Sequence, residues 1–206
     1  MIRISVDDQR TDFLPEDSQN LGEFIEAVSS SLPPNRIVTN IALDGRGLSR
    51  KDATHLYEKT LDSVSEVQIK TAERTLWAAA GVDMSLSCLE GLQKSLLCAA
   101  ELFREADRIR ANRLFVHCME GLERFLETLA ITRHAMNLDF KNYKVDGVSL
   151  TSMESQLSTC LVQLVQHQEN TAYDDLADNI EDTLLTNLCA WSTALRQIRN
   201  SQLSHA

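Results

Sequence analysis

Hydrophobic positions along the chain change their spacing near residue 71. Before that point some segments place an apolar residue at every second position and one segment places it every three to four positions; after it the longer spacing continues throughout. Alternation with a period of two is typical of half-buried strands, whereas a period of 3.6 is typical of amphipathic helices. We therefore predict an α+β protein with two domains, residues 1–71 and residues 72–206.

Three segments of the first domain have strand patterns. MIRISV (1–6) and SEVQIKT (65–71) alternate apolar with polar residues, and RIVTNIAL (36–43) is rich in β-branched residues. Asp44 and Gly45 directly follow RIVTNIAL, and this pair tolerates the positive φ angles of a two-residue hairpin loop. We predict a hairpin at this position.

One amphipathic helix is predicted between the strands at 1–6 and 36–43, in NLGEFIEAVSSSLPP (20–34). Asn20 can cap its first turn, Glu23 stands three residues later as in a capping box, and the two prolines stop the helix. Near Phe13, in the polar stretch before the helix, we predict a further edge strand. The first domain then has the order strand, edge strand, helix, hairpin and closing strand.

This order, with LDGRGL (43–48) after the helix and TLDSV (60–64) before the last strand, resembles that of ubiquitin-like β-grasp domains. The resemblance covers residues 1–71. The chain departs from the modifier proteins of that class, because residues 72–206 follow in place of a free Gly-Gly tail. The resemblance therefore implies a small docking domain and not a conjugated modifier.

The second domain is predicted to be an antiparallel, up-down-up-down four-helix bundle, because long amphipathic helices with short connections pack most simply in that way. Four apolar stripes define the helices, over Met84–Asp107, Arg110–Leu138, Ser149–Gln168 and Thr171–Arg199. TAERTLWAAAG (71–81) adds a leading helical piece, with Gly81 as a bend or cap. The pattern leaves open whether this piece continues into the first long helix.

Two glycines stand at equivalent places in the repeated segments CLEGL (88–92) and CMEGL (118–122). A glycine within a helix costs ~1 kcal/mol relative to alanine, so Gly91 and Gly121 need a local reason. Close packing of two helix backbones is favoured over a functional break in the helices. Both glycines are candidate partner-binding positions, together with Trp77, which is a better anchor than Trp191 because Trp191 falls on an apolar stripe.

Composition and charge narrow the function. The net charge of −10 and the pI near 4.9 argue against nucleic-acid binding, which relies on clustered Lys and Arg. No apolar run approaches the ~20 residues needed to cross a bilayer, and the charged first ten residues do not form a signal peptide. The five cysteines contain no Cys-x-x-Cys pair and lie beside apolar stripes, so we expect buried packing roles in a reducing cytoplasm.

Acidic residues gather at the start of the last predicted helix, where a metal site or an ion-pair cluster could form. Negative charge in a first helical turn is favoured by the helix dipole. In an up-down-up-down bundle this turn also lies at the same end as an arginine-rich turn. We therefore predict exposed ion pairs, with no metal or cofactor, among Arg104, Arg108, Arg110, Arg113, Asp174, Asp175 and Asp178.

An enzyme is the alternative hypothesis. Glu120-x-x-Glu123 is similar to the first magnesium-binding motif of the all-α nucleotide pyrophosphohydrolases. The second motif is represented only by Asp175-x-x-Asp178, which lacks the glutamate of that family. The resemblance implies that these four carboxylates would bind magnesium and catalyse nucleotide hydrolysis.

The helical domain also resembles the flagellar secretion chaperones, which are small acidic bacterial helix bundles. NRLFVHCMEGLERFLETLAITRHAMNLD (112–139) and DDLADNIEDTLLTNLCAWSTALRQI (174–198) carry most of the resemblance, and the first domain departs from that family. The leading hypothesis is a non-catalytic bacterial interaction protein, chaperone-like or adaptor-like. It would bind a partner helix along a bundle groove or a partner strand at the sheet edge; a homodimer through a bundle face is a third possibility.

Overall fold

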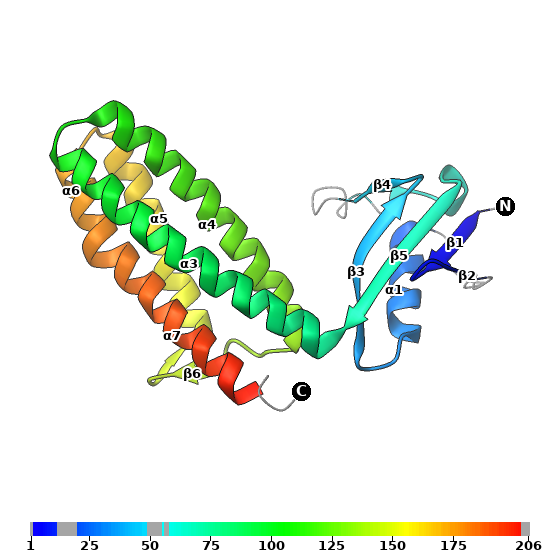
Figure 1. The fold of residues 1–206 in the computed structure, drawn as a ribbon. Helices are drawn as coiled ribbons and strands as arrows, with labels where there is room; N and C mark the ends of the chain where they lie inside the picture. The colour runs from blue at the N-terminus through cyan, green and yellow to red at the C-terminus, as the bar shows by residue number, and fades with distance from the viewer. Residues whose placement is uncertain (1, 12–19, 49–54, 56–57, 203–206) are drawn as a thin grey trace. The chain divides into compact units, whose positions relative to one another are not determined.

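The chain has the predicted fold class, α+β, with a small mixed sheet followed by a helical region (Figure 1). A computed structural model describes residues 2–11, 20–48, 55 and 58–202. The chain is divided into two compact units, Met1–Leu76 and Trp77–Ala206. The edge strand predicted near Phe13 lies outside the described residues.

The first unit contains a five-stranded sheet and one helix. Its strands are β1 (Arg3–Val6), β2 (Gln9–Thr11), β3 (Arg36–Leu43), β4 (Arg46–Gly47) and β5 (Glu66–Glu73), in the order β2-β1-β5-β3-β4. β1 and β5 are parallel, and the other neighbours are antiparallel. Helix α1 (Leu21–Ser31) buries Phe24 and Val28 in the same core as Val67 and Ile69 of β5, and a short 3-10 turn (Leu61–Ser63) precedes β5.

The local signals of the first unit are confirmed where they were specific. Asn20 Oδ1 accepts a hydrogen bond from the backbone N–H of Glu23 at 3.0 Å and so caps α1. Asp44 and Gly45 have φ angles of 50° and 79° and join β3 to β4 in a two-residue hairpin. The sequence pattern therefore located both the helix start and this turn.

A first hairpin, between β1 and β2, was not predicted. Its turn has positive φ at Asp7 (49°) and Asp8 (66°), and no glycine marks it. The Asp7 carboxylate accepts hydrogen bonds from the Thr71 backbone N–H at 2.7 Å and from Arg36 Nη2 at 2.8 Å, and these contacts lower its pKa, the Thr71 hydrogen bonds most. Tertiary contacts to β3 and β5 thus stabilise the β1–β2 turn, which local turn residues do not predict.

The second unit contains five helices among the described residues, and not the four that were predicted. They are α3 (Arg74–Arg104, which begins in the first unit), α4 (Arg108–Met136), α5 (Leu150–Glu169), α6 (Tyr173–Asp178) and α7 (Leu185–Gln202). A π-helical segment, Asn179–Leu184, separates α6 from α7. Backbone angles at Asn179 and Leu185 stay right-handed helical, so the expected last helix is present but changes its hydrogen-bond period.

Two details of the helical prediction are wrong. Helix α3 is continuous, so Gly81 is neither a bend nor a cap and the leading piece joins the first long helix. The connection after α4 contains a two-stranded hairpin, β6 (Lys144–Val145) and β7 (Val148–Ser149), which was not predicted: the domain was expected to be all-α, with a short connection between the second and third long helices. Its turn at Asp146 and Gly147 has φ angles of 51° and 85°, which favour a tight hairpin over a helix.

The core of the helical unit lies along the predicted apolar stripes. Trp191 is fully buried, as its position on a stripe predicted, and its ring meets those of Phe125 and Phe140 at centroid distances of 6.2 and 6.1 Å. No helix in the described ranges has the length and apolar character that crossing a membrane requires. The buried apolar residues of the helical unit form one core cluster.

The cysteines are not all buried. Cys118 and Cys160 are buried, and loss of water around each thiol raises its pKa to about 11. Cys98 and Cys189 are exposed, which corrects the expected packing role, because each lies just outside the helix face that meets the core. Cys88 is partly buried and lies at the seam between α3 and α4.

Candidate partner-binding groove

The seam between α3 and α4 is where the helical glycines lie. A Cβ at Gly121 would come within 2.8 Å of Leu92 Cδ2, so α4 packs closely on α3 there. A Cβ at Gly91 would meet no atom of the described residues within 4 Å, so close packing among them does not explain that glycine. A Cβ at Gly81 would overlap the Thr132 hydroxyl, so Gly81 is the second close-packing glycine.

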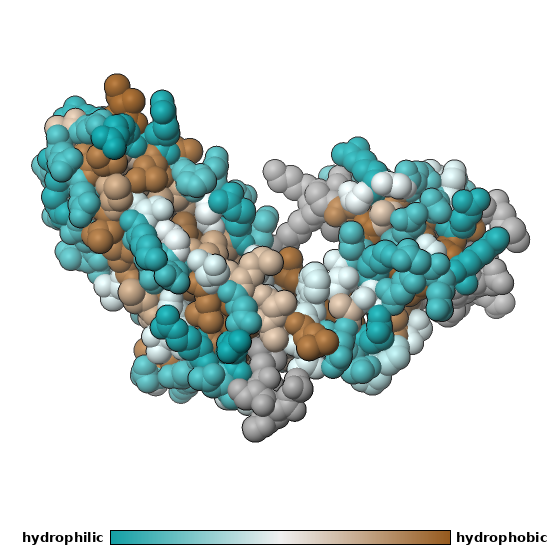
Figure 2. Space-filling view, viewed as in Figure 1, coloured by the Kyte–Doolittle hydropathy of each residue, from teal (hydrophilic) through white to brown (hydrophobic). Residues whose placement is uncertain are grey.

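One end of the seam forms an apolar hollow of about 150 Å³. Three of its apolar side chains are well exposed: Trp77 (37%), Met84 (63%) and Ile131 (49%). The whole lining, here named the apolar hollow, is Trp77, Ala80, Gly81, Met84, Thr128, Ile131 and Thr132. Figure 2 shows apolar residues among the polar ones on the face of this unit along which α3 runs.

A second hollow, of about 230 Å³, lies next along the same seam. Its lining, here named the polar hollow, is Ser87, Cys88, Gly91, Leu92, Ser95, His117, Cys118, Gly121 and Arg124. Helix α3 contributes residues 77–84 to the apolar hollow and residues 87–95 to the polar hollow. Helix α4 runs in the opposite direction and contributes residues 128–132 to the apolar hollow and residues 117–124 to the polar hollow. The two hollows therefore form one groove between antiparallel helices.

The polar hollow is lined in part by the positively charged side chain of Arg124. Arg124 Nη2 lies 3.7 Å from the position that a Cβ of Gly121 would occupy, so the guanidinium folds over the glycine. Cys88 Sγ donates to the Gly121 carbonyl at 3.6 Å, and burial raises the pKa of this thiol while the Arg124 charge opposes that rise. Within the described part of the chain, Arg124 forms no ion pair.

Sequence reasoning named Trp77, Gly91 and Gly121 as partner-binding positions, and the structure places all three on this groove. It missed Met84, Ile131 and Arg124. Arg124 was the easier to find, since it lies one turn after Gly121 on the same helix face. Exposure of Met84 and Ile131 depends on how α3 and α4 rotate about their axes, which apolar spacing alone does not fix.

The arginine-rich turn and the acidic residues lie at one end of the helical unit. Arg104 donates to Asp178 at 2.7 Å and also pairs with Glu181, and these hydrogen bonds, Glu181 first, raise its pKa. Arg108 lies over the Tyr173 ring at 4.8 Å. Helices α3 and α4 therefore meet the start of the α6–α7 segment at this end.

The other members of the predicted ion-pair cluster are not joined to it. Arg110 pairs with Asp107 in its own turn at 3.4 Å. Arg113, Asp174 and Asp175 form no ion pair with any described residue. Among the described residues, Arg104 is therefore the arginine of the cluster that forms ion pairs with the α6–α7 segment, while Arg108 contacts that segment through the Tyr173 ring.

Replacing Arg104 with alanine should lower the free energy of unfolding only slightly at low salt, because exposed ion pairs contribute little. The loss should shrink in 1 M NaCl, where surface charges are screened. Denaturant unfolding of the full chain at both salt concentrations measures it, and Arg113→Ala is the matched control. An equal loss in both variants would contradict a specific role for Arg104.

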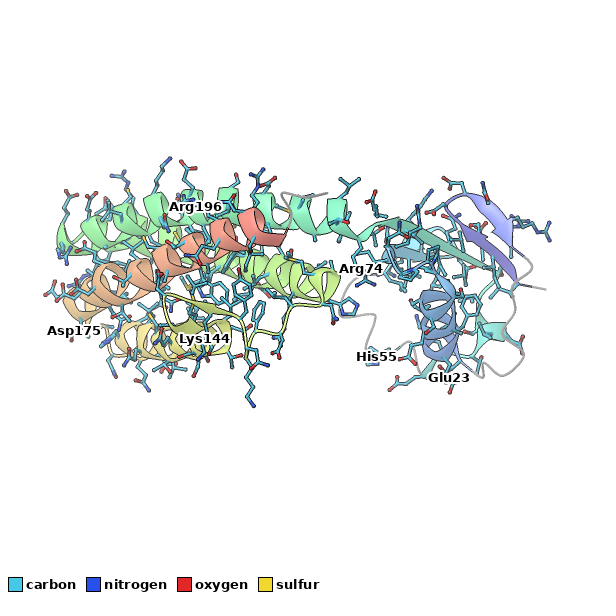
Figure 3. All side chains as sticks on the ribbon, turned by 90° about the horizontal axis from the view of Figure 1, so that it is seen from below. Glu23, His55, Arg74, Lys144, Asp175 and Arg196 are labelled. Carbon is cyan, nitrogen blue, oxygen red and sulfur yellow. The ribbon has the colours of Figure 1, made fainter. Side chains whose placement is uncertain are left out.

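The four carboxylates of the enzyme hypothesis are not gathered. Glu120 and Glu123 are exposed on α4, with Glu120 3.6 Å from His117, and Asp178 is engaged by Arg104. Asp175 is exposed on α6, at the end of the helical unit (Figure 3). Among the residues whose placement is described, no three His, Cys, Asp or Glu side chains converge in the manner of a metal site.

The fold and the groove define a two-unit α+β protein whose helical part has an open seam. Residues 83–194 match the family described as Domain of unknown function (DUF8042), which is more than half of the chain, so the chain belongs to that family. Residues 2–73 match the family described as TP0873 N-terminal domain. No curated protein and no solved structure matches the chain.

Proposed function

We propose that this is a non-catalytic interaction protein, chaperone-like or adaptor-like, whose α3–α4 groove binds an amphipathic helix of another protein. The observation that carries the proposal is the apolar hollow, where Trp77, Met84 and Ile131 keep much of their apolar surface exposed. Exposed apolar surface that lines a groove is favoured as a protein-binding site over scattered exposed residues. A groove between two helices accepts the apolar face of a third helix.

The groove also has the composition of a binding site for a helix. Tryptophan is enriched among the residues that dominate binding energy, and methionine adapts its shape to different partners. Gly91 faces open space, so a partner backbone can approach α3 closely at that point. These features support the likeness to secretion chaperones, which hold an amphipathic segment of another protein.

The first unit supports a second docking element. The strand order β2-β1-β5-β3-β4, with β1 parallel to β5, supports the likeness to ubiquitin-like β-grasp domains. β4 pairs only with Ala42 and Leu43 of β3 among the described residues, which favours the sheet edge as the site for a partner strand. We place the protein in the bacterial cytoplasm, because its five unpaired cysteines suit a reducing compartment.

Substitution of Trp77 by serine should weaken partner binding at least ~30-fold, the effect of losing a hot-spot residue worth 2 kcal/mol or more. Purified full-length protein is used to capture partners from a bacterial lysate, and each captured protein is then purified and titrated against wild type, Trp77→Ser and Met84→Glu. Val162→Ser is the matched control, since Val162 is 56% exposed on α5, away from the groove. Circular dichroism checks that each variant is folded.

Equal affinity of all four proteins for the captured partner would contradict the groove as its binding site. The enzyme alternative is tested in parallel by thermal unfolding with magnesium and nucleoside triphosphates. A large stabilisation that requires magnesium, and that is lost in Glu120→Gln, would favour the hydrolase over the interaction protein.

A further inference from the structure

The polar hollow adds a requirement that the apolar hollow does not impose. Resting on the proposed function, we propose that the partner helix carries a bulky apolar residue for the apolar hollow and an acidic residue about eleven positions away, on the same face, for Arg124. The partner is thereby distinguished from a uniformly apolar helix. Its acidic residue is the feature that fixes where it sits along the groove.

Charge complementarity supports the acidic residue. The chain has a net charge of −10, yet the wall of this hollow presents Arg124, which forms no ion pair with any described residue. Arg124 Nη2 lies 3.7 Å from the Cβ position of Gly121, and the Arg124 charge acts on the thiol of Cys88, so this exposed guanidinium borders the hollow and can be reached by a partner. A guanidinium binds a carboxylate through two parallel hydrogen bonds, which gives both strength and direction.

The shape of the hollow supports a close approach at this point. No atom of the described part of the chain lies within 4 Å of a Cβ position at Gly91, and Ser87 and Ser95 flank this glycine one turn away on each side. A helix can therefore lie low enough for a short side chain to reach Arg124. His117, on the same wall, is turned to Glu120 at 3.6 Å and leaves Arg124 as the principal cation.

The spacing follows from the geometry of α3. Gly81 lies in the apolar hollow and Gly91 in the polar hollow, and ten residues of α-helix rise by about 15 Å. A partner helix that runs along the seam covers the same length in about ten residues. Eleven residues complete just over three turns, so positions i and i+11, or i and i−11 in the opposite direction, share one face, whereas positions ten residues apart do not.

The test is a selection from a library of displayed amphipathic helices. Each helix has one fixed tryptophan in its apolar face, and the positions ten to twelve residues away on both sides are randomised. The library is selected against folded, full-length wild type, Trp77→Ser and Arg124→Glu. Arg113→Glu is the matched charge control, because Arg113 is also an unpaired arginine of α4 among the described residues but lines neither hollow.

Wild type and Arg113→Glu should enrich Asp or Glu at position i+11 or i−11, and Arg124→Glu should enrich Lys or Arg there. Changing the selected acid to its amide should weaken binding to wild type about tenfold and leave binding to Arg124→Glu no weaker. Binders that need Trp77 but show no charge preference would overturn this inference and leave the proposed function standing. Failure to select any binder that needs Trp77 would instead overturn the proposed function.

A second copy of this chain is the competing occupant of the groove. Light scattering of wild type and Arg124→Glu decides between a second copy of this chain and a separate partner helix. We expect the same mass for both, across the concentrations used in the selection. A dimer that Arg124→Glu dissociates would show that the groove meets another copy of this protein, and the inference of a separate acidic partner helix would be wrong.

Discussion

Replacing Trp191 with alanine is expected to lower the free energy of unfolding of the helical unit by ~3–5 kcal/mol, the range measured for large-to-small changes at buried aromatic residues. Trp191 is fully buried and contacts two aromatic rings, Phe125 of α4 and Phe140 of the α4–α5 connection. Its loss would remove the side chain that joins α7 to both. Urea unfolding followed by circular dichroism at 222 nm, where the helices dominate the signal, measures the change.

The control for this prediction is Trp191→Phe. The indole N–H of Trp191 is buried and has no hydrogen-bond partner among the described residues, and an unsatisfied buried donor costs ~1–3 kcal/mol. Phenylalanine keeps an aromatic ring and removes that donor, so the loss should be much smaller than in Trp191→Ala. An equal loss of unfolding free energy in Trp191→Phe and Trp191→Ala would show that the full size of the indole, and not the presence of an aromatic ring, accounts for the stability at this position.

The same residue shows why much of the fold could be predicted from the sequence. Apolar side chains at a period of 3.6 specify which helix face is buried, and Trp191 falls on that face. Local capping and turn chemistry located the start of α1 at Asn20 and the hairpin at Asp44 and Gly45. These features depend on residues close together in the chain, so a single sequence contains what is needed to predict them.

The features that were missed depend on distant residues. Asp7 adopts a positive φ because Thr71 and Arg36 bind its carboxylate, and both are far from it in sequence. The π-helical segment begins at Asn179, whose side chain accepts from the Cys160 thiol at 3.2 Å and donates to Gln163 at 3.2 Å. These contacts to α5 accompany a change of hydrogen-bond period that the regular apolar stripe does not reveal.

The groove was predicted only in part for a related reason. Spacing identified Gly91 and Gly121 as equivalent, because both follow a Cys-x-Glu segment. Their surroundings differ, since Leu92 of α3 packs on Gly121, whereas no residue that the structure describes packs on Gly91. The pairing of side chains across a seam depends on the relative rotation and height of two helices, and one sequence repeat cannot fix both.

Replacing Gly81 with valine should destabilise the helical unit by ~1–3 kcal/mol, the usual cost of adding atoms to a packed site. The new Cβ would overlap the hydroxyl of Thr132, which is 3% exposed and donates to the Thr128 carbonyl at 2.8 Å. The overlap can be relieved only if Thr132 rotates and loses its hydrogen bond to the Thr128 carbonyl, or if α3 and α4 move apart. Denaturant midpoints of the full-length variant and wild type, followed at 222 nm, measure the effect.

Gly91→Val makes the same chemical change in the polar hollow, where no atom of the described residues lies within 4 Å of the new Cβ. The free energy of unfolding of this variant should stay within ~0.5 kcal/mol of wild type. Thr132→Ala should recover part of the loss in Gly81→Val, because the two residues are in contact and their effects are coupled. Comparable losses at both glycines would show that valine is costly anywhere in α3. If Gly91→Val is stable and yet loses the partner, the open space beside Gly91 is used for binding and the closed space beside Gly81 for folding.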